Sequence, residues 1–363
     1  MTTAEPAPTS RPARLHGLDI ARGLAIVGMI VVNVGPVQVD SLLQRLYLLP
    51  YGRASVLFVT IAGIGMGFFL RGRTGTRRWR ELSWRIVLLL VLGLVLQTLT
   101  SSVSVILTTY ALLFLLAPLA WRLASRRLLL LAGVLTVAGP LYIVWHDLEV
   151  HGHAAGAVSL LTPRDEVVHS LLIAGPYPLA SWSVPFLVGL WLSRTRLGDP
   201  SVQRRLVVWG AGTALATFIV ADLAYSALGP EADVGWTRIL TGVGHGQMPL
   251  WIVSATAGAC CVVGACLHWG LRGPVSRWLA GGGTMALTLY VLHVLVLAVI
   301  KPEDGFPLTT GVLTATLLWA GLLTLAAVWQ RDGRVGPLEQ LLRTPWLRRS
   351  SAPTPRPSQE RPP

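Results

Sequence analysis

The feature that most constrains this chain is a series of apolar segments, each close to the length of a membrane-crossing helix. A helix needs about 20 apolar residues to cross the hydrocarbon core of a bilayer. The runs cover residues 18–34, 54–70, 86–99, 103–121, 128–145, 171–192, 206–228, 248–269, 285–300 and 308–329. We therefore expect an all-α, polytopic membrane protein with about ten transmembrane helices.

Composition favours a membrane environment and argues against a nucleic-acid-binding protein. Of the 363 residues, 53% are hydrophobic and 13% charged, whereas soluble domains carry about 25% charged residues. The mean hydropathy is +0.59. The net charge of +13 is spread between the apolar runs and forms no basic face. We therefore expect the lipid bilayer, and no nucleic acid, as a partner.

The distribution of basic residues predicts the orientation, because lysine and arginine are biased toward cytoplasmic loops. Of the 30 lysine and arginine residues, 25 lie in the N-terminal region, in alternate loops or in the C-terminal tail. The intervening loops hold Arg45, Arg53, Arg164, Arg238 and Lys301. We expect both termini in the cytoplasm and a multi-pass protein of the cell membrane.

The chain is expected to form one membrane domain with a tail at each end. Residues 1–13 are predicted to be a cytoplasmic tail, residues 14–346 the transmembrane domain, and residues 347–363, rich in proline and serine, a disordered cytoplasmic tail. Polar residues precede the first run, so we expect a retained helix instead of a cleavable signal peptide. Three cysteines inside one run, Cys260, Cys261 and Cys266, are expected to serve packing.

The first apolar run begins with two charged residues and ends with an amide. Asp19 and Arg22 are three residues apart, which places them on one helix face at the cytoplasmic mouth. They form either an interfacial ion pair or part of a binding site. Asn33 ends the same run. Because an amide in hydrocarbon needs partners, we expect Asn33 to face the protein interior.

Other polar residues gather toward the outer side. Arg53 is either an interfacial anchor or a group that attracts an acidic ligand. The segment GVGHGQMP places His245 and Gln247 between glycines, which let the backbone bend around a ligand. Histidine suits proton transfer near neutral pH, although a single loop histidine is more often structural. His293 lies inside an apolar run and must be satisfied by another helix.

The loop from His146 to His169 holds four histidines and four carboxylates. A metal site there competes with a solvated loop, which we favour because a flexible loop fixes no ligand geometry. We therefore expect no metal. Tyr177 and Trp182, among the prolines of AGPYPLASWSVPF, suit either an interfacial belt running into a kinked helix or the wall of a substrate cleft.

Short motifs exclude several common enzyme classes. No nucleophile elbow, Walker loop, zinc-protease motif or Rossmann fingerprint is present in the sequence. Three closely spaced glycines lie inside an apolar run, with no strand before them, and are expected to allow close helix packing. They are Gly63, Gly65 and Gly67.

Several segments resemble the transmembrane acyltransferase superfamily, in an order that extends over most of the chain. The pattern of Arg14, Asp19, Arg22-Gly23 and a polar residue at position 33 resembles its first helix. GRASVLF, TTYALLFLL, GPYP and GHGQMP follow in the order expected of bacterial proteins related to the catalytic domain of heparan-α-glucosaminide N-acetyltransferase. MALTLYVLH and a tail containing GPLE are similar to a neighbouring uncharacterised bacterial membrane-protein family.

The resemblance implies an enzyme that transfers an acyl group, acetyl in the simplest case, from cytoplasmic acyl-CoA to a hydroxyl or amine at the outer face. Acyl-CoA is then a co-substrate, and no permanently bound cofactor is implied. The implied acceptor is a glycan, a lipid-linked molecule or a small molecule. A homodimer is compatible with the resemblance.

This sequence departs from the family pattern at the catalytic base. Members carry a histidine at the outer end of the first helix or in the loop after it, whereas this chain has Asn33 there and no histidine in the following loop. Either His245 replaces that base or the activity is altered. We predict that His245 takes the proton and that Asn33 polarises the acyl carbonyl. His293 competes as base, but its place within the run favours packing. Further contacts with acyl-CoA or acceptor are expected from Asp19, Arg22, Arg53, Tyr110, Gln247 and His293.

Two other functional classes stay open. A transporter would account for Asp222 and His293 inside apolar runs, but the sequence lacks the paired short or broken spans that mark many transporters. The third class is a non-catalytic scaffold or receptor. Turnover of labelled acyl-CoA by the purified protein would separate the enzyme from both.

Overall fold

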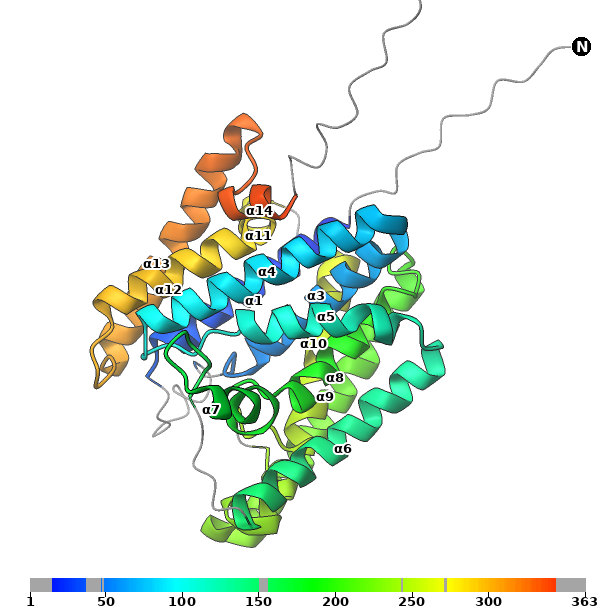
Figure 1. Cartoon of the computed structure of the whole chain (residues 1–363), viewed down its shortest axis with the longest axis vertical. Coiled ribbons are helices and arrows are strands. Elements are labelled where there is room, and N and C mark those ends of the chain that lie inside the picture. Colours follow the sequence, from blue (N-terminus) through cyan, green and yellow to red (C-terminus); the bar gives the residue numbers. More distant parts are fainter. Residues whose placement is uncertain are drawn as a thin grey trace, which may run out of the picture.

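The computed structural model describes residues 15–36, 47, 49–149, 156–242, 244–270 and 273–343, and every regular element within these ranges is a helix (Figure 1). The predicted terminal tails, Arg14, Arg45, His151 and His153 lie outside the described residues. Element labels follow Figure 1.

Each of the ten apolar runs corresponds to a helix or a helix pair. Seven helices are long and apolar enough to cross a membrane: α1 (His16–Val34), α3 (Arg53–Gly72), α4 (Gly75–Leu99), α6 (Ser125–Glu149), α9 (Pro200–Leu228), α10 (Pro249–Trp269) and α13 (Leu308–Trp329). Two bent helix pairs raise the number of candidate spans to nine within the described ranges, and the shorter apolar helix α5 (Leu107–Trp121) occupies the fourth run. The protein is an all-α polytopic membrane protein, as the sequence predicted.

The two bent pairs are breaks in otherwise apolar segments. α7 (Arg164–His169) continues into the π-helical turn η1 (Ser170–Ala174), and this unit meets α8 (Leu179–Leu192) at 54°. The break falls at GPYP, where prolines cannot donate the hydrogen bonds that continue a helix. α11 (Pro274–Thr284) meets α12 (Ala286–Ile300) at 83°. The prolines predicted the first kink, whereas the second bend was not predicted from the sequence.

The remaining elements are short connections. They are the 3-10 turns η2 (Gly229–Asp233), η3 (Gly235–Leu240) and η4 (Gln330–Asp332), and the C-terminal helix α14 (Pro337–Leu342).

α1 and α3 form the interior of the bundle, and α9 lies at its periphery. Ala21, Ala25, Ile26 and Ile30 of α1 have no exposed surface. Large side chains of α9 point outward, where a membrane would meet them with lipid. Asp222 belongs to this exposed surface, so it is not the buried acid that a transport pathway would use. Figure 1 shows α6 and α13 at opposite margins of the bundle.

Glycines allow helix backbones to approach closely in this core. A Cβ atom on Gly23 would collide with the carbonyl oxygen of Leu279, so α1 and α11 pack backbone to backbone. Gly63 faces α8 in the same way, and Gly67 faces the loop after α8. Gly65 has no atom near its Cβ position and is exposed. The predicted packing role is confirmed for two of the three glycines.

Contacts between loops define an inner end of the bundle. Arg71 Nη2, in the last turn of α3, donates to the Ser193 carbonyl at 2.7 Å. Arg194 Nη1, after α8, donates to the Leu123 carbonyl, after α5, at 2.8 Å. These three connections carry arginine-rich segments that the sequence assigns to one side of the membrane.

The opposite, outer end joins loops of the other predicted set. Lys301 Nζ, after α12, donates to the Ser102 carbonyl between α4 and α5 at 3.0 Å. Arg238 Nη1 and Asp147 Oδ2, from two further outer segments, are 2.8 Å apart. The loops are thus grouped as the arginine pattern requires, while the assignment of the inner end to the cytoplasm stays a prediction.

Candidate functional site

A buried amide–imidazole pair lies where α1 approaches α12. Asn33 Nδ2 is 3.0 Å from His293 Nε2, although the two residues are 260 positions apart. His293 has no exposed surface. An amide nitrogen only donates, so the imidazole Nε2 accepts and the ring proton lies on Nδ1. With the amide reversed, Nε2–H would donate to Oδ1, so the contact holds with either tautomer.

A lysine ammonium group lies next to this pair. Lys301 Nζ donates to the backbone carbonyl of Asn33 at 2.7 Å as well as to Ser102. It follows the last residue of α12, and the negative ends of the α1 and α12 dipoles favour a cation there. Burial lowers the pKa of Lys301 below its usual value of 10.5. The amine can therefore lose its proton more readily than a solvated lysine.

Tyr290 connects His293 to the segment between α4 and α5. The two rings meet edge to face with centroids 5.0 Å apart. Tyr290 Oη accepts a hydrogen bond from the backbone N–H of Ile106 at 3.2 Å. The imidazole is therefore held by a ring one helical turn away as well as by Asn33.

His245 lies in a separate cluster of aromatic rings. Ring centroids of Tyr51, Trp182, Tyr177 and Trp251 lie 4.9, 5.9, 5.9 and 6.0 Å from the imidazole. This desolvation lowers the pKa of His245 to about 4, so the ring is neutral at pH 7. In the described part of the chain it makes no hydrogen bond.

The segment around His245 is strained. His245 has φ = 60° and Gln247 has φ = 58°, in the left-handed region that residues with a Cβ seldom adopt. Gln247 Nε2 donates to the Pro176 carbonyl at 3.1 Å, which fixes one side of the turn. Strain of this kind is found at binding and catalytic sites, where the surrounding structure holds it.

Arg53 and Tyr110 contact residues of neighbouring helices. Arg53 Nη1 donates to Ser254 Oγ at 3.0 Å and so links α3 to α10. Tyr110 packs between Phe58 and Phe114, with ring centroids 5.7 and 6.1 Å away. Its buried hydroxyl has no hydrogen-bond partner among the described residues. Tyr110 thus keeps an unused polar group inside the bundle.

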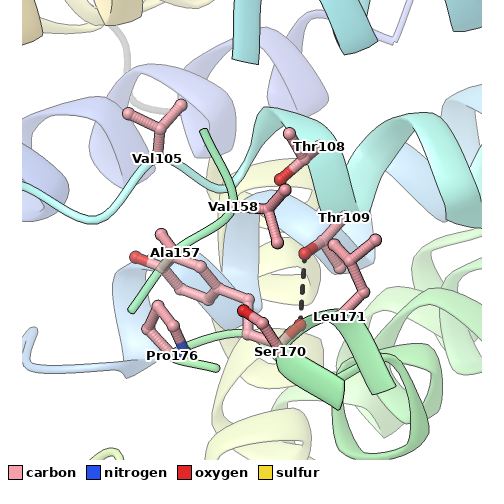
Figure 2. A pocket seen from close by; sticks show the side chains of 9 residues that line it. Val105, Thr108, Thr109, Ala157, Val158, Ser170, Leu171 and Pro176 are labelled. Atoms are coloured by element: carbon pink, nitrogen blue, oxygen red, sulfur yellow. Dashed lines mark hydrogen bonds between the residues drawn. The ribbon is translucent and has the colours of Figure 1, made fainter. Parts of the chain in front are cut away.

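The start of α5 and the residues before it lie between the two histidine clusters. Tyr177 Oη donates to the Ser104 carbonyl at 3.3 Å, and Thr109 Oγ1 donates to the Tyr177 carbonyl at 3.1 Å. Figure 2 shows Thr109 pointing toward this carbonyl across a small pocket that Thr108 and Ser170 also line. Its volume of about 10 Å³ holds one water molecule at most. Movement of this segment would affect both histidines.

At the inner end, the predicted contact between Asp19 and Arg22 is formed. Arg22 Nη1 lies 3.0 Å from Asp19 Oδ1 and 3.4 Å from the carbonyl oxygen of Gly283. Asp19 is buried, whereas the Arg22 side chain keeps 28% of its surface exposed. At 1.5 Å per residue, Arg22 and Asn33 are roughly 16 Å apart along α1.

Most of the predicted site residues therefore fall into three groups, centred on the Asn33–His293 pair, on His245 and on the Asp19–Arg22 pair. Asn33 joins His293, as expected of an amide that faces the interior. No hydrogen bond joins Asn33 to His245 within the described ranges, and Arg53 lies on the His245 side. Lys301 and Tyr290 were missed, although Lys301 ends the run that holds His293 and Tyr290 is three residues before it.

The described residues of the outer loop form no cluster of metal ligands. The rings of His146 and His169 are 4.7 Å apart, but Asp147 is engaged by Arg238. No group of three or more potential ligands comes together in the described ranges. His151 and His153 lie outside those ranges.

Comparison with known protein families gives a match to part of the chain. The model of a family described as "Protein of unknown function (DUF418)" matches residues 192–348, less than half of the chain. None of the curated proteins matches. The matched range contains MALTLYVLH and GPLE, and with them His245, His293 and Lys301. The similarity to this family thus covers one partner of the Asn33–His293 pair, while Asn33 and the Asp19–Arg22 pair lie before it.

Proposed function

We propose that the protein is a membrane-bound acyltransferase of the cell membrane that moves an acyl group, acetyl in the simplest case, from cytoplasmic acyl-CoA to an acceptor at the outer face. The acceptor class is a hydroxyl or amine on a glycan, a lipid-linked molecule or a small molecule. The observation that carries the proposal is the placement of polar pairs at both ends of α1. Asp19 and Arg22 occupy the inner end, and Asn33 with His293 occupies the outer end.

The chemistry assigns one task to each group of the outer pair. The acceptor oxygen or nitrogen attacks the thioester carbon, and the imidazole of His293 takes the acceptor's proton. The amide N–H of Asn33 turns to the acyl oxygen and stabilises its negative charge. Collapse of the tetrahedral intermediate breaks the C–S bond, and the CoA thiolate receives the proton from His293. We thus assign the base to His293, which makes the hydrogen bond to Asn33, in preference to His245.

Purified protein in phosphatidylcholine nanodiscs with radiolabelled acetyl-CoA and a panel of glycan, lipid-linked and small-molecule acceptors that carry a hydroxyl or amine tests this function. We expect CoA release, and removal of a general base should slow it about 10²–10⁴-fold. The informative variants are His293→Gln and His245→Gln, with the exposed His268→Gln as the matched control. Loss of turnover in His293→Gln alone supports the assignment. Loss in His245→Gln alone would return the base to His245, and no turnover by wild-type protein would exclude the enzyme.

A second candidate is a small-molecule transporter, which the two broken helix pairs favour. Discontinuous helices form substrate sites in many transporters, and here α8 and α12 each follow a sharp bend. Proteoliposomes that take up a labelled solute without consuming acyl-CoA would support this candidate.

A further inference from the structure

We infer that a cleft at the inner end binds the phosphorylated adenosine portion of acyl-CoA, an inference that rests on the proposed function and deepens it. The cleft has a volume of about 410 Å³, within the range of about 300–1,000 Å³ typical of ligand pockets. It lies where the starts of α1, α9 and α11 meet the end of α10.

The lining of this cleft suits a planar base attached to phosphates. Leu15, Ile20, Leu267 and Ala280 contribute an apolar wall, against which a ring can stack. The polar and basic side chains are His16, Gln203, Ser276 and Arg277. Gly198 and Gly270 leave the backbone accessible at two edges, whereas Gly17 is buried against the backbone of α10 at Cys266. An apolar wall beside convergent polar groups is the usual composition of a small-molecule site.

Arg277 is the principal anion-binding group. It is exposed, and its guanidinium has no hydrogen bond or ion pair with the described residues. A second cleft of similar volume, at the α3–α4 turn, contains Arg73 and Arg77. Both of these arginines are already paired with Glu81. Of these two clefts, the one that contains Arg277 therefore has an arginine without a partner among the described residues.

The helix ends around the cleft have opposite effects on the binding of a phosphate. α1 and α11 begin there, and neither N-cap residue, Leu15 or Gly273, accepts from the first amides through a side chain. Free amides at a helix N-terminus favour phosphate. The C-terminus of α10, at Cys266 and Leu267, disfavours it. The charge of Arg277 is therefore needed to make binding of an anion favourable.

The position of the cleft connects it to the proposed reaction. Gly17 and Ile20 of α1 line it, and Asp19 and Arg22 are on the same helix within the next turn. Asn33 lies near the opposite end of α1, so the arm of a nucleotide held here would have to run along this helix to reach it. The cleft thus supplies the binding contact that the CoA end requires.

Binding of adenosine 3′,5′-bisphosphate, measured by titration calorimetry in phosphatidylcholine nanodiscs, tests the site without requiring turnover. We expect Arg277→Gln to weaken binding about tenfold or more, as loss of a charged hydrogen bond does. Arg277→Lys should restore part of the affinity. The matched control is Arg80→Gln, an exposed arginine at the inner end but outside the cleft.

The outcomes distinguish failure of the nucleotide site from failure of the proposed transferase function. Equal affinity of wild type, Arg277→Gln and Arg80→Gln would overturn the site. Failure to bind the bisphosphate, with phosphatidylglycerol retained through Arg277 in native mass spectrometry, would identify a lipid-headgroup site and overturn the nucleotide assignment. Arg277-dependent binding without turnover of acetyl-CoA would support the nucleotide site and exclude the transferase. If Arg277→Gln leaves turnover of acetyl-CoA unchanged, the proposed transferase function stands, but acyl-CoA binds at a site other than this cleft.

Discussion

Asn33 Nδ2 and His293 Nε2 are hydrogen-bond partners, and each atom alone would be an unpaired polar group in a hydrocarbon environment. A buried donor or acceptor left without a partner costs about 1–3 kcal/mol, whereas replacing both partners by apolar groups is close to neutral. Stability and activity should therefore respond differently to the loss of one partner and the loss of both.

We predict that Asn33→Leu and His293→Leu each lower the thermal unfolding midpoint, and that the double variant recovers much of that loss while staying inactive. Thermal unfolding in detergent, combined with the acyl-transfer assay, measures both effects. His268→Leu is the control, because His268 is exposed at the end of α10. Losses that simply add in the double variant would show that the two side chains are not coupled.

The depressed pKa of His245 predicts a pH dependence of stability. The pKa is about 4 in the folded protein and 6.5 without burial, so between these values the unfolded chain binds more protons. Stability from this group is complete above pH 6.5 and declines as the pH falls toward 4. The thermal midpoint of wild type should drop over that window, and His245→Gln should drop less. Parallel curves for the two proteins would contradict the burial of a neutral imidazole.

At the scale of elements, the bend between α11 and α12 is held by charged residues from two other helices. Glu339 Oε1 of α14 accepts from the backbone N–H groups of Leu287 and Thr288 at 2.7 and 3.1 Å, and Oε2 accepts from the Thr288 hydroxyl at 2.6 Å. Arg22 donates to the Gly283 carbonyl at the end of α11. Each charge has the sign that the adjoining helix dipole favours. The GPLE segment is thus the cap of the helix that carries His293.

Removing this cap should destabilise the protein. We expect Glu339→Ala to cost about 1 kcal/mol and Glu339→Gln to cost less, because an amide oxygen still accepts from the two N–H groups. Thermal unfolding beside Glu303→Ala, an exposed acid in the loop after α12, measures the difference. Identical midpoints for Glu339→Ala and Glu303→Ala would show that the cap contributes nothing.

For the whole molecule, the open question is which end faces the cytoplasm. We predict that a reporter active only in the cytoplasm works when fused after Arg78 or Arg204 and fails when fused at His151. The reason is the bias of 25 basic residues against five, on loops that the structure collects at opposite ends. An active reporter at His151 would reverse the orientation and place the proposed CoA cleft on the wrong side.

The sequence by itself determined the elements that the bilayer dictates. Apolar runs of helical length must form helices, because lipid offers no partner for backbone groups, and all ten runs are helical. It also determined that Asn33 must face inward and that the prolines of GPYP interrupt their run. Local spacing was enough for Asp19 and Arg22, which lie on the same helix.

Only the tertiary structure decided which distant residues meet. His293 was predicted to need a partner from another helix, yet nothing in the sequence identified Asn33, because pairing between helices depends on the bundle's arrangement. The bend before α12 and its Glu339 cap could not be predicted for the same reason, since the cap comes from α14, a separate helix. His245 lies with Tyr51, Tyr177, Trp182 and Trp251 because three segments of the chain, near residues 51, 177–182 and 245–251, converge there. The periodicity and charge of a segment indicate whether water, lipid or protein surrounds it. The contacts between segments, in contrast, depend on how the helices pack.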